Sequence, residues 1–291
     1  MATTLVGAFD EFRSRLALTN KQKATALAHI KSIESFFETN FVLDSSTGVF
    51  YTGSFRRGTM VRWTRDVDIM ASLSVNKYDP VYGNDSSKFL YMVRDALNER
   101  FTSTKVSTKR MAIRLDFADI TADVVPCFRR KGGGFLMPDG SGNWRATYPG
   151  FHSTLMRKAD EAKANQLKPL VKLLKAWNIA NGHHLSSIHV ELMVERMWRD
   201  DSVISSPYPA AVAETLRVMP GWAANPFPDP WPDGRRIDAD LSAADRNTAV
   251  NMLRQDAKNS AEAEQYRASG QTQKAFEKWD AVFRHQFPAY G

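Results

Sequence analysis

Gly53 and Ser54, followed after eleven residues by Asp66 and Asp68, form the part of this sequence that most restricts its fold and function. Apolar and acidic residues alternate around the two aspartates, which predicts strand structure across residues 49–73 with a turn at Gly53 and Ser54. Aspartates two positions apart on a strand project from the same face, so both carboxylates can reach one site. Magnesium prefers a few hard oxygen ligands of this kind and completes its octahedron with phosphate oxygens. The alternative is a plain turn followed by a solvated strand face.

A two-metal phosphoryl-transfer site needs a third carboxylate, and Asp123 is the best candidate. We expect it on a strand over Ile120–Val125 that ends at the following proline and pairs with a strand over Arg110–Phe117 in an antiparallel hairpin. Asp116 and Asp119 compete for the same role. Because they lie around the proposed turn, where aspartate is common for local hydrogen bonding, we interpret both as turn residues.

Hydrophobic periodicity along the 291 residues indicates a first half that contains a sheet and a second half that is helical. The first forty residues predict a long helix whose main part Thr19 or Asn20 caps, and the Gly-rich residues 131–149 predict an irregular loop. We therefore expect two domains. A catalytic lobe with the N-terminal helix takes residues 1–150, and a helical lobe takes residues 151–291.

Several residues of the second half are expected in the hydrophobic core rather than in a catalytic or binding site. An aromatic stripe recurs at helical spacing and is typical of a buried face; it comprises Phe276, Trp279, Phe283 and Phe287. His189 stands alone in an apolar segment, which favours a hydrogen-bonded core residue over a catalytic one. The Pro-rich residues 220–234 are too dense in proline for regular structure.

Composition excludes further classes of protein. The chain has no run of eighteen apolar residues, and its N-terminus carries acids where a secretory signal has an apolar run, so we expect no membrane segment and a cytoplasmic location. The single cysteine, Cys127, excludes an intramolecular disulfide and a thiolate-rich zinc site, and we expect it in the core. The net charge of +7 suits nucleotides or nucleic acid as ligands, although solubility alone would also explain it.

The segment Gly53–Ile69 resembles the GlySer and Asp-X-Asp signature of the DNA polymerase beta-like nucleotidyltransferases, and within them of the cGAS/DncV-like group (CD-NTases). Asp123–Pro126 resembles the strand that carries the third carboxylate of that family. Leu167–Asn178 resembles its helix whose lysine contacts the donor triphosphate, and Leu185–Leu192 resembles the following segment, whose serine does the same. The resemblance covers about residues 10–288.

The resemblance implies a role for each matched residue. Asp66, Asp68 and Asp123 would be catalytic and would hold two divalent ions, magnesium or manganese. Four residues would bind the nucleotide: Gly53, Ser54, Lys175 and Ser187. Lys172 shares a helix face with Lys175 and could present a second ammonium group, which leaves its role undecided. A solvated lysine face is the alternative for both lysines.

The resemblance also implies an α+β protein with a polymerase beta-like nucleotidyltransferase core, in which a mixed sheet accompanies an N-terminal spine helix and a helical C-terminal lobe. The implied enzyme joins nucleoside triphosphates, ATP among them, into a cyclic di- or trinucleotide and releases pyrophosphate. It would act in bacterial anti-phage signalling, where the product activates an effector. We expect a monomer without activation by DNA, because the DNA sensor of the family needs a zinc insertion that one cysteine cannot build.

Two other functions remain open. A templateless RNA-tailing or tRNA-end nucleotidyltransferase would carry the same three carboxylates, and a broad basic groove with salt-sensitive RNA binding would favour it. A catalytically idle module that binds nucleotides is the second alternative. The three aspartates argue against it, because carboxylates clustered near phosphates are costly unless a metal is bound.

Overall fold

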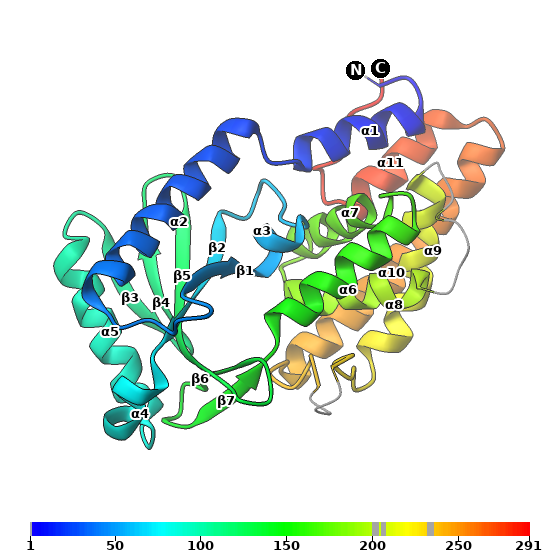
Figure 1. Cartoon of the computed structure of the whole chain (residues 1–291). Coiled ribbons are helices and arrows are strands. Elements are labelled where there is room, and N and C mark those ends of the chain that lie inside the picture. Colours follow the sequence, from blue (N-terminus) through cyan, green and yellow to red (C-terminus); the bar gives the residue numbers. More distant parts are fainter. Residues whose placement is uncertain (1, 200–203, 205–207, 232–235) are drawn as a thin grey trace. The chain divides into compact units, whose positions relative to one another are not determined.

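The computed structural model describes residues 2–199, 204, 208–231 and 236–291 (Figure 1). Contacts divide the chain into two compact units. We call residues 18–58 and 63–154 the sheet unit; the residues up to Ala17, residues 59–62 and residues 155–291 form the helical unit. The expected division after residue 150 falls near the boundary at residues 154 and 155, but the first helix groups with the helical unit rather than with the sheet.

The sheet unit contains one mixed sheet with helices. Its described strands are β1 (Val49–Thr52), β2 (Asp66–Leu73), β3 (Lys105–Lys109), β4 (Ala112–Asp116), β5 (Thr121–Arg129), β6 (Phe135–Pro138) and β7 (Trp144–Thr147). Its helices are α2 (Asn20–Asn40), α3 (Gly53–Arg57), α4 (Val75–Tyr82) and α5 (Ser86–Arg100). The strand order is β1-β2-β5-β4-β3, with β6 beside β5 and β7 beside β6. Only the β2–β5 pair is parallel among these described pairs.

One face of this sheet is the apolar core of the unit. Val67 and Ile69 of β2 are fully buried, and so are Val124 of β5 and Leu115 of β4. They cluster with apolar residues of α2 and α5, both of which contact the strands (Figure 1). Because side chains alternate along a strand, the residues between these positions project from the opposite face. That opposite face carries the polar residues of the sheet.

The segment over residues 49–73 is two strands separated by a short helix and a loop. Strand β1 ends at Thr52, helix α3 begins at Gly53, and β2 begins at Asp66. The predicted turn at Gly53 and Ser54 is therefore the start of α3. The predicted hairpin is confirmed, since β4 and β5 pair antiparallel.

The prediction that Pro126 ends its strand is wrong. Strand β5 continues to Arg129 and pairs with β2 as far as Phe128. Pairing of β5 with β4 ends at Val124 and pairing with β6 begins at Phe128, so Pro126 lies in a gap between the two partners. A proline is tolerated where a ladder is interrupted, because it has no N–H to donate.

The prediction of an irregular loop over residues 131–149 is also wrong in part. This stretch contains the hairpin of β6 and β7. The connection between β5 and β6 contains Gly132, Gly133 and Gly134, so these glycines interrupt regular structure only at this turn. Glycine density indicated the turns correctly but hid the four-residue strands between them.

The helical unit has its own core. Its described helices are α1 (Leu5–Leu16), α7 (Leu167–Ala180), α8 (Ser187–Trp198), α9 (Tyr208–Ala223), α10 (Ala243–Ala268) and α11 (Thr272–Val282), and α6 (Pro149–Ala162) crosses the boundary between the units. The rings of Phe9 and Phe12 in α1 pack edge to face on the predicted aromatic stripe of the C-terminal segment. All four residues of that stripe are buried, which confirms the prediction.

The long N-terminal helix is two helices. Helix α1 ends at Leu16, and Thr19 caps α2 through a capping box with Gln22, as the sequence indicated. The predicted Pro-rich irregular stretch is helical at its start, since α9 extends through Pro220 to Ala223, and its residues 232–234 lie outside the described residues.

Two predicted core residues are buried. The Cys127 thiol contacts the Ala71 carbonyl oxygen at 3.5 Å, and burial raises its pKa. His189 is 1% exposed, which confirms the prediction of a core residue. The expected hydrogen bond is not found at its Nε2, which has no partner among the described residues. Among the described helices, none combines the length and apolar character needed to cross a bilayer.

Candidate active site

Strand register places the three predicted carboxylates on one face of the sheet. Asp68 of β2 pairs directly with Asp123 of β5, and on the far side Asp123 pairs with Arg114 of β4. Directly paired residues share a face, so these side chains form one polar row. Asp66 lies two positions before Asp68 on the same face, beside Thr121. All three aspartates are partly exposed on the face opposite the apolar core.

Gly53 lies next to the Asp68 carboxylate in a backbone conformation that favours glycine. Its φ of 63° is in the left-handed region, which favours glycine. A Cβ at this position would lie 1.7 Å from Oδ2 of Asp68, far closer than any real contact. The backbone of Gly53 therefore approaches the Asp68 carboxylate directly. Ser54 follows in the first turn of α3 and is partly exposed.

Arg114, which was not among the residues predicted from the sequence, contacts the third carboxylate. Its Nε donates to Oδ1 of Asp123 at 2.7 Å, and one terminal nitrogen donates to Oδ2 at 2.6 Å. This hydrogen bond is the largest contribution that raises the pKa of Arg114, and the charges of Asp66 and Asp116 add to it. The signal was present in the alternation of β4, where the apolar neighbours of Arg114 must face the core and so direct Arg114 to the polar face.

The three aspartates meet only some of the requirements of a divalent-cation site. Across the described residues, no three acidic, histidine or cysteine side chains converge closely enough to hold a metal ion. Asp66 and Asp68 supply two carboxylates from one strand face, which is the donor chemistry that magnesium prefers. Both oxygens of Asp123 instead accept from Arg114. The backbone therefore fits the predicted metal site, while the Asp123 side chain has another partner.

The competing aspartates occupy different positions. Asp116 is the last residue of β4 and lies on the polar face, but Thr121 of β5 separates it from Asp66. It is therefore a strand residue rather than the turn residue that we expected. Asp119 lies in the β4–β5 turn, as expected, and contacts Nε2 of His29 at 2.9 Å. Neither lies next to Asp68, so Asp123 is the better third carboxylate.

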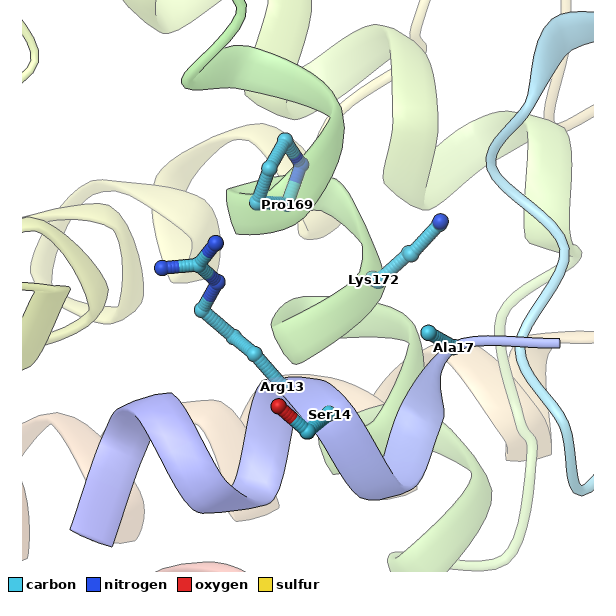
Figure 2. A pocket seen from close by; sticks show the side chains of 5 residues that line it. All are labelled: Arg13, Ser14, Ala17, Pro169 and Lys172. Atoms are coloured by element: carbon cyan, nitrogen blue, oxygen red, sulfur yellow. The ribbon is translucent and has the colours of Figure 1, made fainter. Parts of the chain in front are cut away.

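The predicted nucleotide-binding lysines of the helical unit have unlike surroundings. Lys175 is 1% exposed, and its Nζ donates to Oε1 of Glu191 at 3.0 Å in a buried ion pair between α7 and α8. Lys172 is partly exposed and lines a pocket of about 190 Å³ with residues of α1 (Figure 2). Arg13 of α1 also lines this pocket, and Figure 2 shows its side chain and that of Lys172 pointing in different directions. Ser187 is the partly exposed first residue of α8.

Comparisons with known proteins identify the family of this chain. A family model for the Second Messenger Oligonucleotide or Dinucleotide Synthetase (SMODS) domain matches residues 3–159. A probable cyclic nucleotide synthase of Bacillus cereus (strain VD146) is 23% identical over 100% of this chain and 99% of that protein. The matched region of the family model contains the start of α3 and all three aspartates.

Solved structures share the fold. The structure of CdnC from E. coli MS115-1 with ATP has a TM-score of 0.79 at 14% identity, covering 97% of this chain and 98% of that one. The Vibrio cholerae cyclic AMP-GMP synthase DncV, in complex with the linear intermediate 5' pppA(3',5')pG, has a TM-score of 0.73 at 13% identity, covering 94% and 93%. The expected polymerase beta-like α+β fold is confirmed. The chain therefore belongs to the SMODS family of nucleotidyltransferases, within the CD-NTase group that its sequence resembles.

Proposed function

We propose that this enzyme joins nucleoside triphosphates into a cyclic di- or trinucleotide and releases pyrophosphate. The row of Asp68 and Asp123 on adjacent strands, with Asp66 on the same face, carries the proposal. Such a row is suited to phosphoryl transfer, in which the protein mainly positions the reactants and neutralises charge. The similarity to a probable cyclic nucleotide synthase and to a synthase bound to a linear dinucleotide supports a cyclic product.

The proposal includes two divalent cations, magnesium or manganese. Asp66 and Asp68 would hold them from β2, and Asp123 would join after it leaves Arg114. Bound there, the cations would lower the pKa of the acceptor hydroxyl and neutralise the departing pyrophosphate. The close approach of Gly53 to Asp68 fixes the backbone beside these carboxylates.

The same proposal assigns the nucleotide contacts. The Ser54 hydroxyl and the adjoining backbone of Gly53 would donate to the donor phosphates beside the carboxylates. In the helical unit, Lys172 and Ser187 are both partly exposed and would contact the triphosphate. Lys175 was the expected contact, but its ammonium group is buried against Glu191. We therefore transfer the role to Lys172 and propose that Lys175 joins α7 to α8.

The cellular context belongs to the proposal as well. We propose a cytoplasmic, monomeric enzyme of bacterial anti-phage defence, whose product activates a separate effector. Activation by DNA is not part of it, because the single Cys127 is buried and no cysteine-rich zinc insertion can form.

Product analysis tests this function. The purified protein is incubated with all four ribonucleoside triphosphates and magnesium or manganese, treated with phosphatase and examined by mass spectrometry. A phosphatase-resistant species at the mass of a cyclic di- or trinucleotide is expected, and its mass names the bases. A parallel reaction with added RNA separates the tailing alternative: extension of the RNA, with no cyclic species in either reaction, would contradict the proposal.

A further inference from the structure

We propose that Arg114 is a positioning residue that holds the Asp123 carboxylate in the metal-free enzyme and must release it before Asp123 can serve the metal site. This inference rests on the proposed function, because it concerns the same carboxylates. It adds Arg114 to the three aspartates of the proposed site, and it implies that a guanidinium and a divalent cation compete for one carboxylate.

The geometry of the contact is that of a strong, directional pair. Both oxygens of Asp123 accept from Arg114, at 2.7 and 2.6 Å, and such two-point guanidinium–carboxylate pairs are stronger and more specific than single hydrogen bonds. The side chains are 24% and 16% exposed, so water competes only weakly for them. The paired strands fix both backbones, since Arg114 and Asp123 are direct partners in the β4–β5 register.

The buried neighbours of Arg114 keep it on this face. Ile113 and Leu115 are fully buried in the core of the sheet unit, so β4 cannot rotate to remove Arg114 from the polar row. The contact is therefore built into the sheet and does not depend on a loop. A divalent cation can bind the Asp123 carboxylate only if it replaces the Arg114 side chain there.

The surrounding charges make this exchange feasible. Lys109 is a second cation near Asp123 among the described residues, with its Nζ 3.8 Å from Oδ2. The negative charge of Asp116 also acts on Arg114, so Arg114 retains an acidic neighbour after it releases Asp123. When a divalent cation replaces Arg114 at Asp123, the guanidinium would therefore not be left unpaired, which is the main cost of breaking a partly buried ion pair.

Manganese binding in the absence of nucleotide tests the inference without relying on catalysis. Free Mn²⁺ is measured by electron paramagnetic resonance during titration of the full chain, for the wild type and for R114M, R114K and K109M. R114M removes both the positive charge and the two-point contact with Asp123. R114K keeps the charge but cannot make the two-point contact. K109M removes a nearby charge that makes no such contact. Thermal unfolding of each variant verifies folding, and R114K serves if R114M does not fold.

We expect R114M to lower the Mn²⁺ dissociation constant about tenfold, the size typical of residues that orient metal ligands, with a smaller effect for R114K. K109M should change it by about twofold or less, as an exposed charge does. The effect should disappear when R114M is combined with D123N, because the gain acts through that carboxylate.

Two results would overturn the inference and are distinguishable. If D68N abolishes Mn²⁺ binding while R114M alters it no more than K109M does, the metal site stands and the role of Arg114 is wrong. If D66N, D68N and D123N all bind Mn²⁺ as the wild type does, the proposed metal site itself is wrong, and the inference falls with it.

Discussion

Lys172 and Lys175 are three positions apart on one helix, yet their side chains have different surroundings. The ammonium group of Lys175 is almost fully excluded from water and is paired with Glu191, whereas Lys172 lines an open pocket. A buried charge requires a partner, because the interior cannot replace the lost hydration. The spacing of the two lysines in the sequence could not distinguish these environments, because they depend on which side chains of other helices lie beside each lysine.

Substitution of each lysine should therefore have a different effect. Lys172→Ala should raise the KM for nucleoside triphosphate about tenfold or more through a lost charge-assisted contact, with little change in the unfolding temperature. Lys175→Ala should lower the free energy of unfolding by about 3–5 kcal/mol, because it removes the ammonium group that is paired with the buried Glu191 carboxylate. Steady-state kinetics and differential scanning calorimetry separate the two effects. A destabilised Lys172→Ala protein and a stable Lys175→Ala protein with raised KM would reverse our assignment.

His189 gives a pH dependence of stability. Burial lowers its pKa from 6.5 to about 4, while the Asp238 charge raises it and the Arg246 charge lowers it. Between these pH values the unfolded chain binds the proton and the folded chain does not. The free energy of unfolding should therefore fall as the pH is lowered from 6.5 to 4, by at most about 1.4 kcal/mol per pH unit.

Calorimetric scans of the wild type and His189→Leu over this pH range check the prediction. The variant lacks the titrating group and should show a shallower decline of stability with acid. Equal slopes in the two proteins would mean that His189 does not contribute.

At the scale of elements, the junction of β1 and α3 determines the shape of the site. Strand β1 pairs with β2 so that Thr52 lies beside Asp68, and the chain then turns at Gly53 with φ of 63°. The helix begins immediately, which brings Ser54 to the same end of the sheet. At this point the backbone, rather than a side chain, lies against Asp68, one of the proposed catalytic residues.

Gly53→Ala should reduce turnover at least about a hundredfold, because the new Cβ would displace the Asp68 carboxylate, and small misplacements of reacting groups have effects of this size. Gly48→Ala is a matched control. Gly48 has a similar φ of 58°, but the nearest atom to an added Cβ is 3.9 Å away. Both variants should lose a similar amount of stability from backbone strain, about 1 kcal/mol. Equal activity in the two variants would show that the clash with Asp68 does not matter.

The sequence predicted the elements that carry a local signal. Alternation in Asp66–Ile69, the capping residue Thr19 and the stripe of Phe276 all correspond to observed structure, because each pattern is decided by neighbours within a few residues. The end of strand β5 was wrongly predicted at Pro126, because whether a proline is tolerated within a strand depends on which strands lie beside it. Arg114 and Glu191 were missed for the same reason, since their partners are set by strand and helix pairing.

At the scale of the whole molecule, the two units have separate hydrophobic clusters, and each contains some of the residues to which we assign a role. The sheet unit contains the aspartates, Gly53 and Ser54, and the helical unit contains Lys172 and Ser187. The residues up to Ala17 belong to the helical unit although the following helix α2 belongs to the sheet unit. Contacts distant in sequence decide this grouping, and local periodicity does not report them.

The net charge of +7 permits nonspecific attraction to nucleic acid, so activation by DNA can be examined directly. We expect double-stranded DNA to change the rate of cyclic product formation by less than about twofold at 0.15 M salt, where screening weakens exposed charges. Product quantification with and without DNA checks this. A strong, length-dependent stimulation would contradict the expectation drawn from the single cysteine.

Product formation by aspartate variants tests the central claim, that the row on β2 and β5 is the catalytic centre. Asp68→Asn and Asp123→Asn should each lower the yield of phosphatase-resistant cyclic nucleotide at least about a thousandfold, and Asp68→Asn should leave the unfolding temperature close to that of the wild type. Asp116→Asn, on the same sheet face but not beside Asp68, is the matched control and should stay within a few-fold of the wild type. Near wild-type turnover by Asp68→Asn in magnesium would contradict the account.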